Sequence, residues 1–235
     1  MFGRQRFAVG LPVWIVLAML LPPTASAALR VPQVAISGDG LQGALNGAGE
    51  SIDVRTDQDE ATFLSTFIVL NLSYFMQVYL KAKPAGHSIG FYNAADANPV
   101  LYEVFPPAAA AGWFAVITFR NSPVRATVIL LDDQFQIVSN VTYFGADKHA
   151  IGFYLDYPDA RFYSQDQRNP AGEAQFLFFR GKNINAGDWW IAGEDRSRSG
   201  GADGDFDDVL IYVDDPGYIV PVQRSSWGTL KARFR

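Results

Sequence analysis

The 235-residue chain contains no cysteine and only two histidines. Without cysteine it has no disulfide bond, no thiolate metal site and no cysteine nucleophile, and a domain of about 200 residues can rely on its core for stability. A basic surface is also lacking, because 24 acidic residues outnumber 19 basic ones and give a formal charge of -5. We therefore expect no nucleic-acid partner. The 49% hydrophobic and 14% aromatic residues predict a folded core instead.

The first 27 residues have the layout of a secretory signal peptide. Arg4 and Arg6 form a short positive region, an apolar stretch follows from Phe7 to Leu21, and Ala25-Ser26-Ala27 forms a cleavage site. A retained membrane anchor is the alternative, but the apolar stretch is short for a span. We expect cleavage after Ala27, export to the periplasm or the medium, and no membrane attachment afterwards. The mature formal charge is then -7, because two arginines are removed.

The segment after the predicted cleavage site has a weaker secondary-structure pattern. Residues 28–60 are rich in Gly, Ala, Ser and Asp, which predicts a loosely ordered lead-in with an edge strand at Ser51 to Arg55. Ala61 to Leu80 then carries no charge in 20 residues. This length suits a membrane span, but the even positions form one apolar face, which is typical of one β-strand or of two strands with a break near Asn71. A second membrane span is the less favoured alternative.

Short strand-like runs recur along the rest of the chain, with turn signals such as Asp215-Pro216-Gly217 between them. This spacing predicts one all-β antiparallel domain over residues 61–224, a β-sandwich or jelly roll, with a C-terminal tail at 225–235. The one helical candidate is the short segment from Pro107 to Ala111. The predicted strands are Phe114–Phe119, Ala126–Leu131, Gln136–Phe144, Ile151–Leu155, Gln175–Phe179, Trp189–Ala192, Val209–Val213 and Tyr218–Val222.

Both histidines open the same short motif. His87-Ser88-Ile89-Gly90-Phe91-Tyr92 is matched 62 residues later by His149-Ala150-Ile151-Gly152-Phe153-Tyr154. One interpretation is a two-histidine metal pair. We favour the other, a duplicated strand in which Ile, Phe and Tyr pack and Gly allows a close backbone approach. The reason is that neither histidine is accompanied by a carboxylate at ligand spacing.

The densest charge lies between residues 194 and 215, which hold eight acids and two arginines. Carboxylates this close repel one another unless a cation lies among them, and calcium accepts about six to eight oxygen ligands in irregular geometry. Asp203, Asp205 and Asp207 alternate, and Gly204 lets the backbone curl, so these carboxylates can converge. We predict a calcium-type site. Its preferred ligands are Glu194, Asp203, Asp205 and Asp208, followed by Asp195 and Asp207.

The spacing departs from the EF-hand loop, because the sixth position is Asp208 rather than Gly and the twelfth is Asp214 rather than Glu. We therefore expect a strand–loop–strand site, in which Asp208 has the alternative of binding backbone N–H groups. Two other interpretations of the loop are an acidic hairpin without a ligand and a secreted, glycosidase-like hydrolase that uses Glu194 and Asp205. A further class is a sugar-binding adhesin with exposed aromatics at Trp113, Trp189, Trp190 and Trp227.

Several motifs occur in order in the second half of the chain: Ile151-Gly152-Phe153-Tyr154-Leu155, Phe162-Tyr163-Ser164, Asn169-Pro170, Gly193-Glu194-Asp195 and Asp203-Gly204-Asp205-Phe206-Asp207-Asp208-Val209. Together they resemble the bacterial family called domain of unknown function 4114, found in secreted and surface proteins. Ile89 to Tyr92 looks like the start of the same domain, so the resemblance covers roughly residues 85–215. The family often has Asn in place of Asp207, and a histidine where this chain has Gln175.

The resemblance implies an extracellular β-rich domain without a settled activity. Taken with the acidic loop, it leads us to expect a secreted bacterial protein with a calcium site that acts as an extracellular binding or structural module. An extracellular glycan or surface component is the expected partner, and a non-enzymatic role is favoured over the hydrolase.

Overall fold

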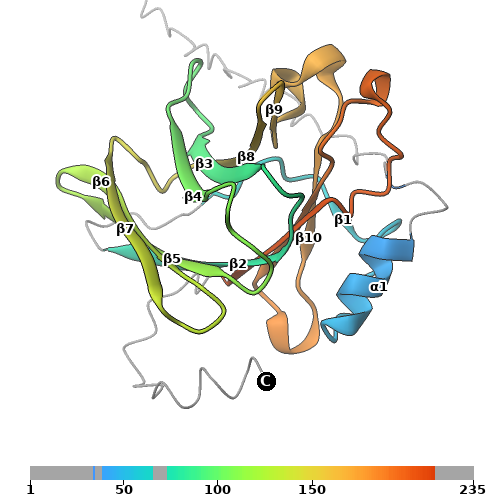
Figure 1. Ribbon diagram of the computed structural model, residues 1–235, viewed down its shortest axis with the longest axis horizontal. Coiled ribbons are helices and arrows are strands. Elements are labelled where there is room, and N and C mark those ends of the chain that lie inside the picture. Colours follow the sequence, from blue (N-terminus) through green and yellow to red (C-terminus); the bar gives the residue numbers. More distant parts are fainter. Residues whose placement is uncertain (1–33, 35–38, 66–72, 215–235) are drawn as a thin grey trace, which may run out of the picture.

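The computed structural model describes residue 34 and residues 39–65 and 73–214 (Figure 1). These residues form an eight-stranded sheet in the order β1-β10-β11-β12-β2-β5-β6-β7 and a four-stranded sheet in the order β4-β3-β8-β9. Every pair of neighbouring strands is antiparallel. The predicted all-β, sandwich-like fold is confirmed. No helix in the described part of the chain has the length and apolarity needed to span a membrane.

The eight-stranded sheet consists of β1 (Gln58–Asp59), β2 (Tyr74–Ala82), β5 (Phe114–Asn121), β6 (Val124–Leu131), β7 (Ile137–Phe144), β10 (Phe176–Arg180), β11 (Trp189–Gly193) and β12 (Val209–Asp214). The four-stranded sheet consists of β3 (Ser88–Asn93), β4 (Leu101–Phe105), β8 (Ile151–Tyr157) and β9 (Ala160–Tyr163). Helix α1 spans Asp39–Gly47, and short 3-10 turns lie at Asp166–Arg168, Pro170–Gly172, Asn183–Asn185 and Arg198–Gly200.

The main core lies between the two sheets. Met76, Val78 and Leu80 of β2 point into it, as their even numbering predicts, and Ile191 and Ile211 join them from β11 and β12. Such alternation buries one face of each strand and leaves the other face for a second contact. The predicted break near Asn71 lies outside the described residues.

The repeated histidine motif forms the centre of the four-stranded sheet. β3 and β8 pair so that Gly90 lies opposite Tyr154 and Gly152 lies opposite Tyr92. A Cβ atom added at Gly152 would lie 2.3 Å from the ring of Tyr92, and one added at Gly90 would lie 2.6 Å from the ring of Tyr154. Each glycine therefore makes room for the tyrosine of the other copy, which supports the structural interpretation of the repeat.

A second apolar cluster lies on the outer face of the eight-stranded sheet, where α1 packs beside β10 (Figure 1). Leu41 and Leu45, four residues apart on one side of α1, are fully buried there against Phe179 and Trp190. From residue 39 to residue 60 the structure thus differs from the loosely ordered lead-in expected for residues 28–60. It also places a helix where none was predicted, because two leucines among three glycines give only a weak helical pattern.

The strand boundaries agree with most of the predicted runs. The edge strand expected at Ser51 to Arg55 is absent, and β1 lies a few residues further on; Pro107 to Ala111 forms turns rather than a helix. β4 and β9 were not predicted. The predicted signal peptide, the predicted strand at Tyr218–Val222 and the predicted C-terminal tail lie outside the described residues.

Candidate functional site

The acidic loop joins β11 to β12 at one end of the eight-stranded sheet. Glu194 directly follows β11, and its backbone N–H donates to the carbonyl of Gln175 at 3.0 Å, which continues the β10–β11 ladder by one residue. The chain then makes a 3-10 turn at Arg198–Gly200 and returns through residues 202–208 into β12. Glu194 is thereby fixed to the sheet, while the aspartates lie on the returning arm.

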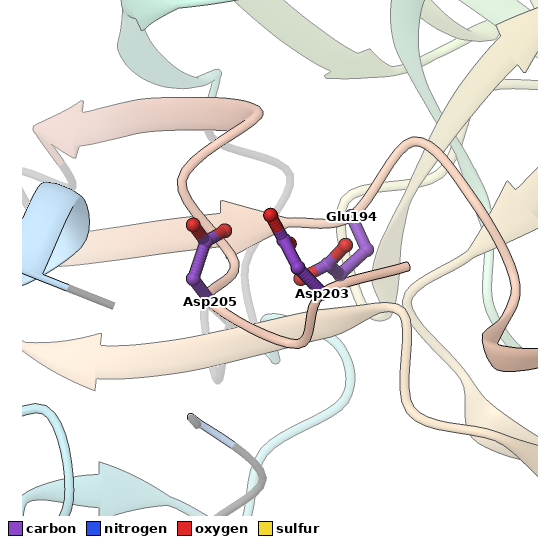
Figure 2. A group of neighbouring side chains, drawn as sticks. All are labelled: Glu194, Asp203 and Asp205. Carbon is purple, nitrogen blue, oxygen red and sulfur yellow. The ribbon is translucent and has the colours of Figure 1, made fainter. Parts of the chain in front are cut away.

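Three of the predicted ligands converge at this point. Glu194, Asp203 and Asp205 each offer one carboxylate oxygen, and these atoms lie within 4.8 Å of one another. Figure 2 shows Glu194 reaching from the end of its strand toward Asp203, with Asp205 on the same loop. Two oxygens bound to one calcium ion at 2.3–2.6 Å are at most about 5 Å apart, so this spacing suits a single ion.

Glu194 is an unusual member of this group because it is only 2% exposed. Its Oε1 accepts a hydrogen bond from the backbone N–H of Phe206 at 2.7 Å, whereas Oε2 is buried without a hydrogen-bond partner. Burial raises the pKa of Glu194 to about 7; the bond from Phe206 opposes this shift, and the nearby Asp208, Asp203 and Asp205 add to it. A buried carboxylate oxygen without a donor is costly unless a proton or a cation satisfies it.

Phe206 anchors the returning arm. Its ring is 2% exposed and belongs to the apolar cluster beneath α1, although it sits among four aspartates. Its backbone has φ 57°, and Gly204 before it has φ 77°, so the loop curls through two left-handed residues. This curl directs the N–H of Phe206 at Glu194. Sequence reasoning missed this role, although an aromatic residue within an acidic run was a visible signal.

Asp208 forms a hydrogen bond that joins the two arms of the acidic loop. Its Oδ2 accepts a hydrogen bond from the backbone N–H of Asp195 at 3.0 Å, so it joins the two arms of the loop at their base. Burial raises the pKa of Asp208; the hydrogen bond from the Asp195 backbone opposes this shift, and the nearby Asp195 carboxylate adds to it. The structure leaves Asp208 outside the three converging carboxylates, and its bond to a backbone N–H is the alternative expected for it.

Asp195 is not one of the three converging carboxylates. Its carboxylate lies 3.7 Å from Nε2 of His87 and 3.6 Å from Nε of Arg196. His87 is buried, its ring stacks on Tyr157 with centroids 4.2 Å apart, and its Nδ1 lies 3.1 Å from the carbonyl oxygen of Ala85. A histidine distant in sequence, which the sequence pattern did not reveal, thus lies beside one of the six predicted ligands.

Asp207 faces α1. A Cβ atom added at Gly40, in the first turn of the helix, would lie 1.7 Å from Oδ2 of Asp207. Burial raises the pKa of Asp207, and Asp205 raises it further. Its backbone N–H donates to Oδ1 of Asp205 at 3.2 Å. Asp207 therefore links the loop to the helix that covers the outer face of the sheet, and the structure does not bring it to Glu194.

The two histidines do not form a pair. They precede β3 and β8, which run antiparallel through six paired residues, so they lie at opposite ends of that ladder. His149 is exposed and its Nδ1 contacts Oδ1 of Asp147 at 2.5 Å. The ladder of six pairs separates them by about 20 Å, which excludes a shared ion.

The hydrolase and adhesin alternatives can be compared with the same geometry. An aromatic-lined pocket of about 420 Å³ lies on the outer face of the sheet, with none of the six loop acids in its lining. Trp189 and Trp190 are both buried and Trp113 is partly buried, whereas sugar-stacking residues would be exposed. Trp227 lies outside the described residues. The acidic loop thus closes a sheet end and does not face that pocket.

No family model matches the chain, and comparisons with curated proteins and with solved structures find no significant similarity. The resemblance to domain of unknown function 4114 therefore rests on the ordered motifs alone.

Proposed function

We propose that the loop between β11 and β12 binds one calcium-type cation, and that the protein is a secreted bacterial module with a binding or structural role outside the cytoplasm. The observation that carries the cation site is the carboxylate of Glu194. It is almost fully buried, one of its oxygens has no hydrogen-bond partner, and it faces Asp203 and Asp205. A divalent cation would satisfy that oxygen and neutralise the repulsion among the three carboxylates.

The three carboxylates supply part of the coordination that calcium requires. Calcium binds about six to eight oxygens, so backbone carbonyls and water would complete the shell, as they do in other protein sites. Asp208 would hold the two arms of the loop together, and Asp207 would hold the loop against α1. The ion would then stabilise the junction of β11, β12 and α1.

Thermal unfolding tests this proposal. A cation that binds only the folded state stabilises it by about 2.7 kcal/mol at one hundred times its dissociation constant, which corresponds to a rise of about 5–10 °C for a chain of this size. We expect that rise when calcium replaces chelator. The rise should disappear in the double variant Asp203→Asn, Asp205→Asn.

The matched control is the double variant Asp133→Asn, Asp159→Asn, which removes two exposed carboxylates elsewhere on the surface. It changes the net charge equally and should keep the full response to calcium. Equal melting temperatures in chelator and in calcium for the unaltered protein would reject the cation site.

A secreted hydrolase is the second candidate, and the raised pKa of Glu194, about 7, is the one feature that favours it. A carboxyl group with that pKa could act as a general acid near neutral pH, with Asp205 as its partner. Release of nitrophenol from nitrophenyl glycosides would support this function if Glu194→Gln abolished it. The absence of turnover across such a panel would leave the cation site as the function of the loop.

A further inference from the structure

β7 is the last strand of the eight-stranded sheet and differs from every other sheet edge in the described part of the chain. The outermost strands elsewhere are short or charged: β1 has two residues and Asp59 pairs with Arg180, β4 carries the exposed Glu103, and β9 has four residues with Arg161 paired to Asp156. Such features protect an edge from pairing with other strands.

β7 has eight residues, Ile-Val-Ser-Asn-Val-Thr-Tyr-Phe, and none is charged, proline or glycine. Four of the eight are exposed large hydrophobic residues, with Ile137 and Phe144 67% and 69% exposed. A register shift between Leu130 and Leu131 of β6 disturbs the start of the strand, but the stretch from Ser139 to Phe144 pairs regularly with β6. A regular, uncharged and apolar edge of this kind favours strand addition.

The backbone groups available on this edge can be assigned. The N–H of Gly145 donates to the carbonyl of Val124 in β6 at 2.8 Å, so residues in phase with Gly145 point toward β6. The direction of the backbone N–H and C=O groups alternates along an antiparallel ladder. The backbone groups of Val141 and Tyr143 therefore point toward β6, whereas those of Asn140 and Thr142 point away from it, to the open side of the strand. An added antiparallel strand must therefore form its hydrogen-bonded pairs with residues 140 and 142.

We propose that β7 pairs with β7 of a second copy of this chain, antiparallel and about a two-fold axis through Val141. This register places Asn140 opposite Thr142 of the partner subunit and joins the outward-facing backbone groups of both strands. The opposing pairs are Val141 with Val141, Asn140 with Thr142, Ser139 with Tyr143, and Val138 with Phe144. All of these except Ser139 with Tyr143 place polar residues opposite polar ones or apolar residues opposite apolar ones.

The polarity pattern of β7 favours a second copy of this chain as its partner. Apart from Ser139 and Tyr143, the sequence from Val138 to Phe144 is palindromic in polarity about Val141, which suits a two-fold interface between identical strands. A strand without charge offers no electrostatic selection for a foreign partner, whereas self-pairing satisfies both its backbone and its side chains. The proposal is independent of the cation site, which lies at the other end of the sheet.

Cysteine scanning tests the register, since the chain has no cysteine of its own. In a non-hydrogen-bonded pair the Cα atoms are about 4.5 Å apart, within the range that a disulfide spans. Under mild oxidation Val141→Cys should form a covalent dimer, whereas Asn140→Cys should form far less. Preferential cross-linking of Asn140→Cys, or of neither variant, would overturn the proposed axis.

Light scattering tests the association itself. The purified protein should elute with twice the mass of one chain at micromolar concentrations, and Val141→Lys, which sets two like charges opposite each other, should elute as a monomer. Ile184→Lys, a matched change at a residue 85% exposed elsewhere, should stay dimeric. An unchanged melting temperature of Val141→Lys at high dilution would show that the monomer folds. A monomeric unaltered protein, or a dimeric Val141→Lys, would refute the proposal.

Discussion

The two ends of the eight-stranded sheet differ in how far their strands are buried. At one end β10, β11 and β12 are covered on both faces, by the four-stranded sheet on the inside and by α1 on the outside. At the other end β7 is exposed except at Ser139 and Tyr143, which are half-buried. The covered end carries the acidic loop, whereas β7 itself has no charged residue.

The difference shows how charge and apolar surface are distributed to different ends of one sheet. A loop with repelling carboxylates needs a rigid base, which the doubly buried strands and the anchor of Phe206 provide. An edge that pairs with another chain needs accessible backbone and apolar side chains, which β7 provides. The covered end is therefore suited to binding an ion, and the open end to binding a protein.

The largest effect should separate two phenylalanines. Phe178→Ala removes a fully buried ring between the sheets and should lower the free energy of unfolding by about 3–5 kcal/mol. Phe144→Ala, on β7, should change it by no more than about 0.5 kcal/mol in the monomer. Urea unfolding at low protein concentration measures both. Similar losses at the two positions would show that β7 is not an open edge.

The second effect tests the cover over the acidic end. Leu45→Ala in α1 should cost about 2–4 kcal/mol, because its side chain is fully buried on the outer face of the sheet. Ala44→Ser, at the neighbouring exposed position, should lower the free energy of unfolding by about 0.5 kcal/mol at most. Urea unfolding curves that are equal for the two variants would mean that α1 does not cover the sheet in solution.

A smaller effect should appear in the pH dependence without metal. The pKa of Glu194 is raised to about 7 in the folded state, above its ordinary value of 4.5, so the folded state holds an extra proton between these values. Stability that depends on that proton is present at low pH and is lost as the pH rises from about 4.5 through 7. Melting temperatures in chelator should fall over this range more steeply for the unaltered protein than for Glu194→Gln. Parallel curves would contradict the burial of this carboxylate.

Most of the β-architecture could be predicted because short apolar or alternating runs lie between clear turn signals. Met76, Val78 and Leu80 were assigned correctly to one face from their spacing alone. α1 could not be predicted in this way, because its stability comes from packing Leu41 and Leu45 on the sheet rather than from helix-forming residues. The short edge strand β9 carried too few residues for a recognisable period.

The candidate site was predicted in part. Charge density and the alternation of Asp203 and Asp205 were sufficient to locate the converging carboxylates, together with Glu194. The separate roles of Asp195, Asp207 and Asp208 depend on partners that are distant in sequence: His87, Gly40 and the opposite arm of the loop. The six acids of this loop look equivalent in the sequence. Only the fold distinguishes the acids that face one another from those that hold the loop in place.

The most direct test of the cation site is a calcium titration of Glu194→Gln beside the unaltered protein, with melting temperatures of both in chelator above pH 7. The account predicts one calcium bound per unaltered chain and none by the variant. It also predicts that the variant melts higher in chelator, because the substitution removes a buried charge that lacks a partner. A variant that binds calcium as tightly as the unaltered protein, or that melts at a lower temperature than it in chelator, would contradict the proposal that Glu194 is a ligand of the cation.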